Sequence, residues 1–262
     1  MTAPRRRWTL RRVAGGVGRR TPLRPLRLVF PFGVWRHLFR LWLATIRAQP
    51  DRRQALRQLF VAVDDVEAAL DRGALAYGDG VHPKHRLTGY HDFFVERITA
   101  RERVLDVGCG IGSVAYDIAV RSGAQVVGID TSPWSLDVAR SRFGHPRVTY
   151  VQADALTYAF EEPVDVVVLS NVLEHIAPRV ELLRALRERA GASRALVRVP
   201  DIDRHWSVPL RAELGLPYFS DPTHELEYTP ELLDEELSAA GWQMGDPILR
   251  WGEIWVEATA SP

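Results

Sequence analysis

Cysteine is nearly absent from this chain: its 262 residues include one, Cys109. A single cysteine cannot form an intrachain disulfide, so the sequence excludes a disulfide-stapled scaffold and favours a reducing compartment. It also excludes a structural zinc site built from several cysteines. No uncharged apolar run reaches the roughly 18 residues of a simple membrane-spanning helix. The composition is 46% hydrophobic and 26% charged, which excludes wholesale disorder and fibrous repeats.

Acidic residues are scarce in the first part of the chain. Residues 1–60 carry 15 Arg and one acid, Asp51, for a net charge of +14, whereas the other 202 residues carry −13. A basic arm is therefore joined to an acidic body. Such an arm can meet nucleic acid, anionic lipid or the acidic body itself. Arg outnumbers Lys 33 to 1 in the whole chain, so coding composition is an alternative source of part of this bias.

The sequence predicts three parts. Residues 1–50 form a basic arm and a cationic amphipathic helix, residues 51–100 a helical cap, and residues 101–262 a ligand-binding domain with an insertion at 201–229. Residues 1–27 show no apolar periodicity and are expected to be a mobile tail. Arginines interrupt any apolar stretch there, which argues against an export signal.

The amphipathic helix is predicted over residues 34–47. One face carries apolar side chains and the opposite face carries arginines; the apolar set is Trp35, Leu38, Phe39, Trp42 and Ile46, and the basic set is Arg36, Arg40 and Arg47. Such a helix can lie in a membrane interface with its rings at headgroup level, or pack the same face onto the protein body. The first alternative predicts peripheral contact with anionic membrane through residues 28–47, at the inner face.

From residue 103, short apolar strands alternate with helices, a pattern typical of a parallel sheet with right-handed crossovers. Strands are expected at 103–107, 125–129, 148–152, 164–170 and 195–199, and helices at 51–73, 88–99, 133–142, 180–189 and 231–240. A further helix is expected after the glycine-rich turn, ending near residue 121. Two last strands, near 247–251 and 254–258, are spaced for an antiparallel hairpin at the sheet edge. The predicted fold class is α/β, a mostly parallel Rossmann-like sheet with an antiparallel edge hairpin and an N-terminal helical extension.

The strongest motif is the segment Val104–Gly112, in which a buried strand runs into glycines and then a helix. Glycines let a ligand approach the backbone without a Cβ in the way, and open α/β sheets bind ligands at this carboxyl edge. The next strand ends in Asp130, 22 residues past Gly108, where an acid can accept both hydroxyls of a ribose. The third strand ends in Asp154, so two carboxylates can face one nucleoside.

Two nucleoside cofactors compete for this edge. A dinucleotide fold favours Gly-x-Gly-x-x-Gly, with a pyrophosphate at the helix N-terminus. Here the third glycine, Gly112, comes one residue early, and Ser113 occupies the expected place. Asp106, two residues before the first glycine, opposes the charge of phosphates but suits a cationic ligand. The sequence therefore favours a sulfonium cofactor.

Four segments in order resemble the successive motifs of class I S-adenosylmethionine-dependent methyltransferases: Val104–Gly112, Val127–Asp130, Ala153–Asp154 and Leu169–Ile176. The resemblance spans about residues 82–258 and implies S-adenosylmethionine as the cofactor. More narrowly, the segments His82–Phe94, Tyr218–Thr229 and Trp251–Trp255 resemble a bacterial subgroup linked to cell-surface glycan assembly. The resemblance does not extend to residues 1–60.

The resemblance implies which residues meet the methionine end of the cofactor. Gly108 and Gly110 would line it through their backbone, and Asp106 would order the loop and meet the amino group. The alternative for Asp106 is an acid that orders the loop and never touches the ligand. Arg86, in the loop before the first strand, is expected to pair with the cofactor carboxylate.

The nucleoside end and the methyl-transfer side follow from the later motifs. The resemblance implies that Asp130 holds the ribose hydroxyls and that Asp154 meets the adenine amine, with Ala155 beside the ring. Asn171, just past the fourth strand, would line the methyl-transfer side.

Methyl transfer requires alignment, and an oxygen nucleophile of high pKa also requires a base. The catalytic candidates are His175, after the fourth strand, and His224, in the insertion; we expect both to point into one pocket. The alternatives are a loop-supporting role for His175 and a surface position for His224. Asp221, His224 and Glu225 could also bind a metal, but the sequence offers no third clear ligand, so no metal is predicted. Aromatic residues of the insertion can supply flat walls that suit a hydroxylated ring; they are Trp206, Tyr218 and Phe219.

The predicted function is methyl transfer from S-adenosylmethionine to a small-molecule or glycan acceptor, at oxygen, in the cytoplasm. Cys109 lies inside the glycine turn, which argues against a cysteine adduct at a pyrimidine carbon. Residues 170–173 lack the Pro-Pro-aromatic element associated with amino methylation of DNA bases, so a nucleic-acid substrate rests on the arginine arm alone and is not expected. Two alternatives stay open: an RNA or protein methyltransferase recruited by the basic arm, and a non-catalytic binding module.

Overall fold

The computed structural model describes residues 30–160 and 162–261 and divides the chain into two compact units, Met1–Leu59 and Phe60–Pro262. The tail predicted for residues 1–27 lies outside the described residues. In the first unit, helix α2 (Phe32–Arg47) is joined by a short turn to the start of helix α3 (Arg52–Tyr77), and Gln49 Nε2 donates to Gln58 Oε1 across that turn at 2.7 Å. The amphipathic helix is thus confirmed, two residues longer at its start than predicted.

Helix α3 corrects one predicted boundary, because it does not end at Gly73 but continues to Tyr77. A glycine inside a helix costs only about 1 kcal/mol relative to alanine, which the hydrogen bonds of the flanking turns outweigh. Gly80, three residues past the helix end, has φ +85° and donates its backbone N–H to Leu75 O at 2.8 Å. A left-handed glycine just past the last turn is a common helix stop.

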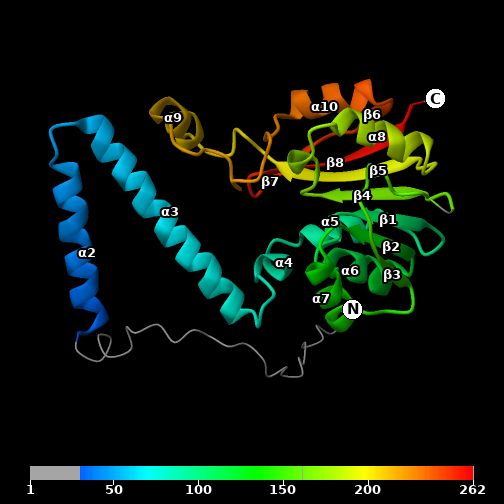
Figure 1. The fold of residues 1–262 in the computed structure, drawn as a ribbon, viewed down its shortest axis with the longest axis horizontal. Helices are drawn as coiled ribbons and strands as arrows, with labels where there is room; N and C mark the ends of the chain where they lie inside the picture. The colour runs from blue at the N-terminus through cyan, green and yellow to red at the C-terminus, as the bar shows by residue number, and fades with distance from the viewer. Residues whose placement is uncertain (1–29, 161, 262) are drawn as a thin grey trace, which may run out of the picture. The chain divides into compact units, whose positions relative to one another are not determined.

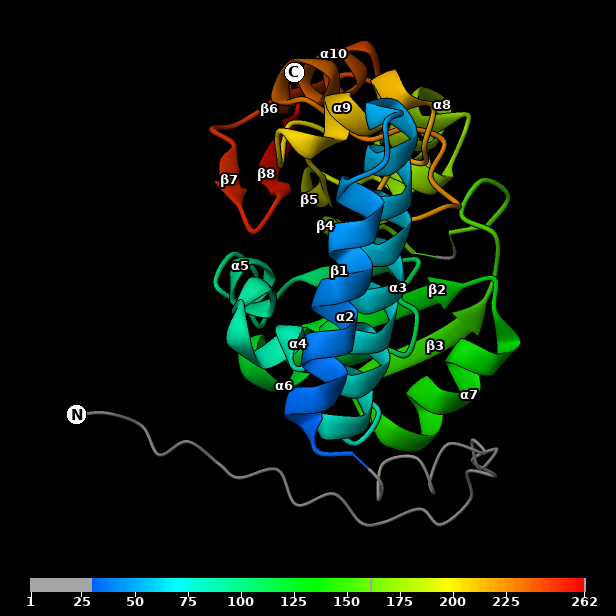
Figure 2. The same cartoon turned by 90° about the vertical axis from the view of Figure 1, so that its left-hand side faces the viewer.

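The second unit is built around an eight-stranded sheet (Figures 1 and 2). Seven strands follow the order β3-β2-β1-β4-β5-β8-β6, and β7 pairs with β8 off this path. The strands are β1 Arg103–Val107, β2 Gln125–Asp130, β3 Val148–Gln152, β4 Val166–Ser170, β5 Arg194–Pro200, β6 Trp242–Met244, β7 Ile248–Arg250 and β8 Glu253–Ala260. Pairs among β1 to β5 are parallel, and β8 pairs antiparallel with β5, β6 and β7. The predicted α/β class with an antiparallel edge is confirmed.

Helices cover both faces of this sheet. In β4, Val166 and Val168 pack with α5, α6 and α7, whereas Val167 and Leu169 pack with α8 and α10. Successive side chains of a strand point to opposite faces, so a strand buried on both faces is apolar throughout. These helices are α5 Tyr90–Val95, α6 Ser113–Ser122, α7 Pro133–Arg142, α8 Arg179–Glu188 and α10 Pro230–Ala239.

Three short elements depart from the predicted pattern. Strand β6 has three residues, too few for a periodic signal, and it is anchored by Trp242, whose Nε1 donates to Leu183 O at 2.9 Å. Helix α9 (Ser207–Leu214) lies inside the insertion, and helix α4 (Lys84–Leu87) inside the predicted loop before α5. The helix predicted over 88–99 is shorter, Tyr90–Val95. None of the helices among the described residues is both long and apolar enough to span a bilayer.

Candidate active site

The glycine turn after β1 needs its glycines for different reasons. All three have positive φ: +63° at Gly108, +52° at Gly110 and +83° at Gly112. A Cβ on Gly112 would lie 2.4 Å from the hydroxyl of Tyr150, whereas a Cβ on Gly110 would meet no atom within 4 Å. Gly112 is therefore required by packing, and the open space beside Gly110 is free for a ligand.

A cavity of about 500 Å³ lies at the carboxyl ends of β1, β2, β3 and β4. That volume lies within the range of small-molecule sites. Six residues predicted to bind cofactor or act in catalysis line it: Gly108, Asp130, Asp154, Ala155, Asn171 and His175. The structure thus brings together most of the predicted site. Gly110, Asp106, Arg86 and His224 are not among the lining residues.

Asp130 and Asp154, the two acids predicted to bind the nucleoside, differ in how many hydrogen bonds fix their carboxylates. Asp130 accepts hydrogen bonds from the backbone N–H of Gly110 and of Ser132, each at 2.8 Å. These bonds tie the end of β2 to the glycine turn and fix its carboxylate at the cavity wall. Asp154 is exposed, and its Oδ1 accepts from Leu156 N at 2.9 Å. Each carboxylate oxygen has a further lone pair for a ligand.

Asp106 lies behind the cavity rather than in its wall. Its side chain is buried, and its Oδ2 has no hydrogen-bond partner among the described residues. Burial, and then the charge of Asp130, raise the pKa of Asp106 to about 7. Its predicted contact with the cofactor amino group stays a prediction. Arg86 is exposed on α4, and its predicted pairing with the cofactor carboxylate also stays a prediction.

Asn171 stands at the end of β4 in a conformation that side chains rarely adopt. Its φ is +57°, and its Oδ1 is buried in the cavity wall with no hydrogen-bond partner among the described groups. A left-handed non-glycine residue and an unsatisfied buried acceptor both cost free energy, and such costs concentrate at functional sites. Asn171 is therefore well placed to meet a ligand in this cavity.

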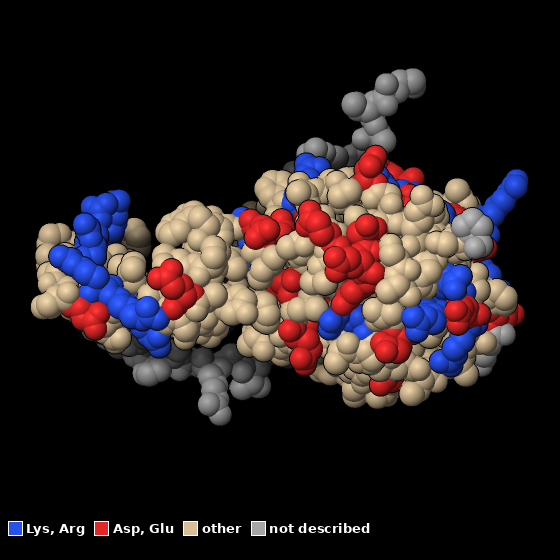
Figure 3. Space-filling model, turned by 90° about the horizontal axis from the view of Figure 1, so that it is seen from above, with Lys and Arg blue, Asp and Glu red and all other residues tan. Residues whose placement is uncertain are grey.

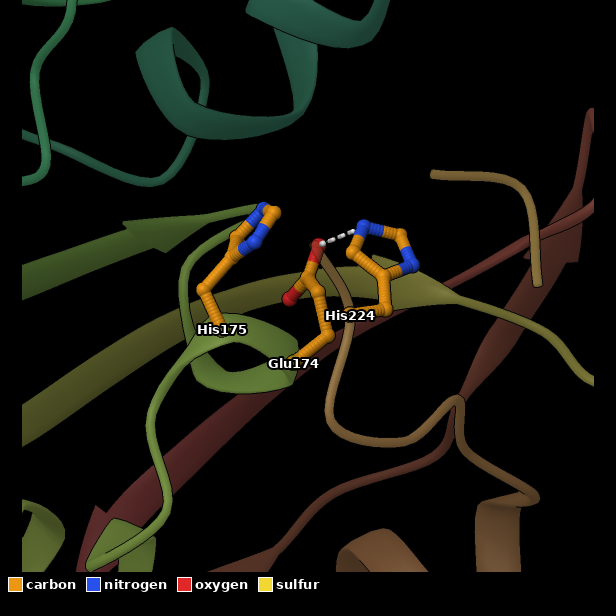
Figure 4. A group of neighbouring side chains, drawn as sticks. All are labelled: Glu174, His175 and His224. Atoms are coloured by element: carbon orange, nitrogen blue, oxygen red, sulfur yellow. Dashed lines mark ion pairs between the residues drawn. The ribbon is translucent and has the colours of Figure 1, made fainter. Parts of the chain in front are cut away.

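Next to Asn171, three side chains converge from two segments (Figure 4). Glu174 and His175 lie on the short helix η1 (Leu173–His175), and His224 comes from the insertion. The two imidazole rings have centroids 4.6 Å apart, and one donor atom from each of the three side chains lies within 4.8 Å of the others. The predicted proximity of the two histidines is thus observed, although only His175 lines the cavity.

Buried partners hold His224 in place. Its side chain is 4% exposed, and its Nδ1 lies 3.1 Å from Oε1 of Glu227. Glu227 is itself fully buried, where it pairs with Arg204 and accepts from the hydroxyl of Ser220 at 2.6 Å. The other ring nitrogen, Nε2, lies 4.0 Å from Oε1 of Glu174.

His175 is held by the insertion as well. Its Nδ1 lies 3.0 Å from Oγ1 of Thr223, which donates to Oδ1 of Asp221 at 2.6 Å. The backbone also ties the two segments together, because Glu225 N donates to Glu174 O at 2.8 Å. The insertion therefore reaches the site through residues 221–227. Its aromatic residues do not line the cavity; these are Trp206, Tyr218 and Phe219.

Glu174 is the residue that sequence reasoning missed. It is 0% exposed, burial raises its pKa to about 8, and neither carboxylate oxygen has a hydrogen-bond partner among the described groups. The available signal was its place beside His175 just past a buried strand. The sequence raised Asp221, His224 and Glu225 as possible metal ligands without predicting a metal. The group of candidate ligands among the described residues is Glu174, His175 and His224.

Comparisons with known proteins agree with this geometry. Residues 104–193 match the family model described as a methyltransferase domain. The chain is similar to a ubiquinone biosynthesis O-methyltransferase of Ruegeria pomeroyi, with 31% identity over 172 residues that cover 62% of this chain and 67% of that protein. The protein of the same name from Azorhizobium caulinodans is 33% identical over 153 residues, 55% of this chain and 60% of that protein. The chain thus spans about three fifths of the length of that second relative.

Among solved structures, the magnesium protoporphyrin IX methyltransferase of Synechocystis, with bound SAH, has a TM-score of 0.53 at 17% identity. The alignment covers 68% of this chain and 83% of that one, and at this identity it supports the fold alone. The relatives and the strand order together confirm the predicted family and its cofactor, S-adenosylmethionine. The chain belongs to the class I S-adenosylmethionine-dependent methyltransferases.

Proposed function

We propose that this protein transfers the methyl group of S-adenosylmethionine to a hydroxyl oxygen of a small molecule or glycan. The observation that carries the proposal is the cavity itself, since the nucleoside acids Asp130 and Asp154 share its wall with Asn171 and His175. Cofactor residues and a proton-accepting side chain are thus within one space. The Ruegeria and Azorhizobium relatives are named for O-methylation, which also favours oxygen as the acceptor atom.

The residues would divide the work between binding and proton transfer. Asp130 and Asp154 hold the nucleoside, and Gly108 and Gly110 leave room for the methionine end. The sulfonium is already activated, so the main requirement is to align oxygen, methyl carbon and sulfur. His175 lines the cavity and is therefore the better placed of the two predicted bases. The ring of His224 packs against it.

The acceptor proposed is a hydroxylated small molecule or a glycan. The narrower resemblance of His82–Phe94, Tyr218–Thr229 and Trp251–Trp255 to glycan-associated enzymes favours the glycan. A panel of catechols, hydroxy acids and glycosides, incubated with the full chain and labelled S-adenosylmethionine, tests the proposal. Label transferred to an alkali-stable ether supports it; transfer only to RNA or protein, or cofactor binding without any transfer, favours the corresponding alternative.

The base assignment has its own test. His175→Ala should lower turnover on the acceptor found by about 10²–10⁴-fold, because it removes proton transfer from the reacting hydroxyl. His205→Ala is the matched control, since His205 is an exposed histidine whose Nδ1 contacts Ser207 at 2.7 Å. Calorimetry with S-adenosylmethionine should give similar affinities for both variants; an equal loss of turnover in both would contradict the assignment.

We also propose that α2 makes peripheral contact with anionic membrane. Four of the five predicted apolar residues are 41–48% exposed, and only Ile46 is buried. Phe32, at the helix start, is 81% exposed. Exposed aromatic rings beside arginines fit an interface between acyl chains and anionic headgroups. This contact would hold a cytoplasmic protein at the inner membrane face.

A further inference from the structure

We propose that Glu174, His175 and His224 bind one divalent transition-metal ion at the edge of the cavity. The three side chains converge from helix η1 and from the insertion (Figure 4), and one donor atom of each lies within 4.8 Å of the others. Metal–ligand bonds of about 2.0–2.2 Å would draw these atoms closer together. The sequence placed the two histidines together but did not indicate Glu174, which is adjacent to His175 and lies 50 residues before His224.

The first support is the carboxylate of Glu174. It is 0% exposed, and neither of its oxygens accepts a hydrogen bond from any described group. The ring nitrogen Nε2 of His224 lies 4.0 Å from Oε1 of Glu174, which is too far for a hydrogen bond. A buried carboxylate without donors is costly, and a bound cation is the partner that would satisfy it.

The second support is the orientation of the two imidazoles. His224 Nδ1 is engaged by Glu227 at 3.1 Å, and His175 Nδ1 by Thr223 Oγ1 at 3.0 Å. Each ring therefore keeps its Nε2 available. Histidines that bind metals commonly donate their other ring N–H to a carboxylate or an oxygen acceptor, which fixes both tautomer and orientation. For His224, the buried carboxylate of Glu227 is such an acceptor.

The donor set suggests the kind of ion. Two imidazoles and one carboxylate suit Zn²⁺, Mn²⁺ or Fe²⁺, whereas Mg²⁺ and Ca²⁺ favour oxygen ligands. Three protein ligands leave coordination positions for water or substrate, as in catalytic zinc sites. His175 lines the cavity, so those positions are within reach of its contents.

A role for the ion rests on the proposed function. The ion would lower the pKa of an acceptor hydroxyl bound to it, so that the hydroxyl could lose its proton to water. Its oxygen then forms the bond to the methyl carbon, and the carbon–sulfur electron pair returns to sulfur, leaving a neutral thioether. Coordinated His175 would then be a ligand and not a free base, so a metal requirement for turnover separates the two mechanisms.

Metal binding is tested on the full chain, without any acceptor. The protein is stripped with a chelator, titrated with Zn²⁺ in a calorimeter, and dialysed for elemental analysis. We expect about one equivalent of Zn²⁺ bound to the wild type. Glu174→Gln should weaken this affinity by at least about tenfold, because it replaces an anionic ligand by a neutral amide of equal size. Co²⁺ substitution should give visible absorption bands that the variant lacks.

The controls make the outcome decisive. His205→Ala removes an exposed histidine outside the cluster and should bind Zn²⁺ like the wild type. S-adenosylmethionine binding by Glu174→Gln reports that its fold is intact; if that variant is unfolded, His224→Asn replaces it. Absence of stoichiometric Zn²⁺ or Mn²⁺ binding to the wild type, or equal binding by the variants, overturns the proposal. Metal binding without O-methylation would support the metal site and contradict only the proposed function.

Discussion

At the scale of single residues, Asp130 connects the glycine turn to the cofactor cavity. Its carboxylate accepts from two backbone N–H groups and lines the cavity wall. We predict that Asp130→Ala weakens S-adenosylmethionine binding by about 10–100-fold, because a lost charge-assisted hydrogen bond costs about 1.5–3 kcal/mol. Calorimetry measures the change. Asp137→Ala, which removes a 79%-exposed acid on α7, is the control and should bind normally.

Asp106 gives a pH-dependent prediction about stability. Its pKa is raised from the ordinary value of 3.8 to about 7 by burial and by the charge of Asp130. Between these values the folded protein keeps a proton that the unfolded chain has lost, so this group's contribution to stability falls as pH rises from about 4 to 7. Asp106→Asn, neutral throughout, removes this dependence.

Urea unfolding of the cofactor-free protein at pH 5 and pH 8 measures the effect. Relative to the wild type, Asp106→Asn should be more stable at pH 8 than at pH 5, by a difference on the order of a few kcal/mol. The comparison between variant and wild type cancels other groups, such as Glu174, that titrate in the same range. A difference of opposite sign would mean that Asp106 is held as an anion.

Single residues also show which parts of the site could be predicted from the sequence and which could not. Gly108, Asp130, Asp154 and Asn171 were identifiable because each lies at or just past the carboxyl end of a predicted strand, and parallel strands end at one sheet edge. Glu174 was not, because its significance depends on burial and on His224, which only the folded insertion brings near it. Contacts between segments distant in sequence leave no local pattern.

At the scale of elements, the strand–turn–helix unit β1–α6 depends on Gly112. A Cβ there would lie 2.4 Å from the hydroxyl of Tyr150, whose oxygen lies 3.1 Å from Gly112 O and 3.0 Å from Phe143 O. Gly112→Ala must adopt φ +83° and displace that ring. We predict a loss of about 2–5 kcal/mol in the free energy of unfolding, the sum of backbone strain and overpacking.

Gly110→Ala is the matched control for this prediction. Its φ of +52° is also left-handed, but a Cβ there meets no atom within 4 Å. It should therefore lose only about 1–2 kcal/mol, the backbone part of the cost. Thermal unfolding of both variants separates the two contributions; equal losses would show that contact with Tyr150 is unimportant.

Element boundaries were predicted best where a local chemical signal exists. Helix α7 begins at Pro133 as expected, with Ser132 accepting a hydrogen bond from Ser135 N at 3.2 Å. Strand β6 and helix α9 were missed, since each is short and is held by contacts with distant residues. Arg211 on α9, for example, pairs with Asp64 on α3 at 2.6 Å.

At the scale of the whole molecule, charge is distributed by region. Figure 3 shows acidic side chains gathered over the face that carries α10, whose exposed acids include Glu231, Asp234 and Glu235. Within the first unit, basic side chains gather where α2 meets α3, among them Arg47 and Arg52. The acidic surface of the second unit repels anionic partners, including anionic lipid. The basic first unit is therefore the part of the chain that anionic lipid attracts.

This asymmetry gives the last prediction, which concerns membrane contact. The full chain should co-float with vesicles containing anionic lipid and not with neutral vesicles, because arginines draw α2 to the surface before its rings insert. Replacing Trp35, Phe39 and Trp42 by Ser should abolish flotation while S-adenosylmethionine binding survives, since these residues lie in the first unit and the cofactor cavity is lined entirely by the second. Replacing the exposed Trp134 on α7 by Ser is the control and should leave flotation unchanged. Flotation that persists without the three rings, but disappears when the arginines before residue 30 are removed, would place the contact in the basic arm instead of α2.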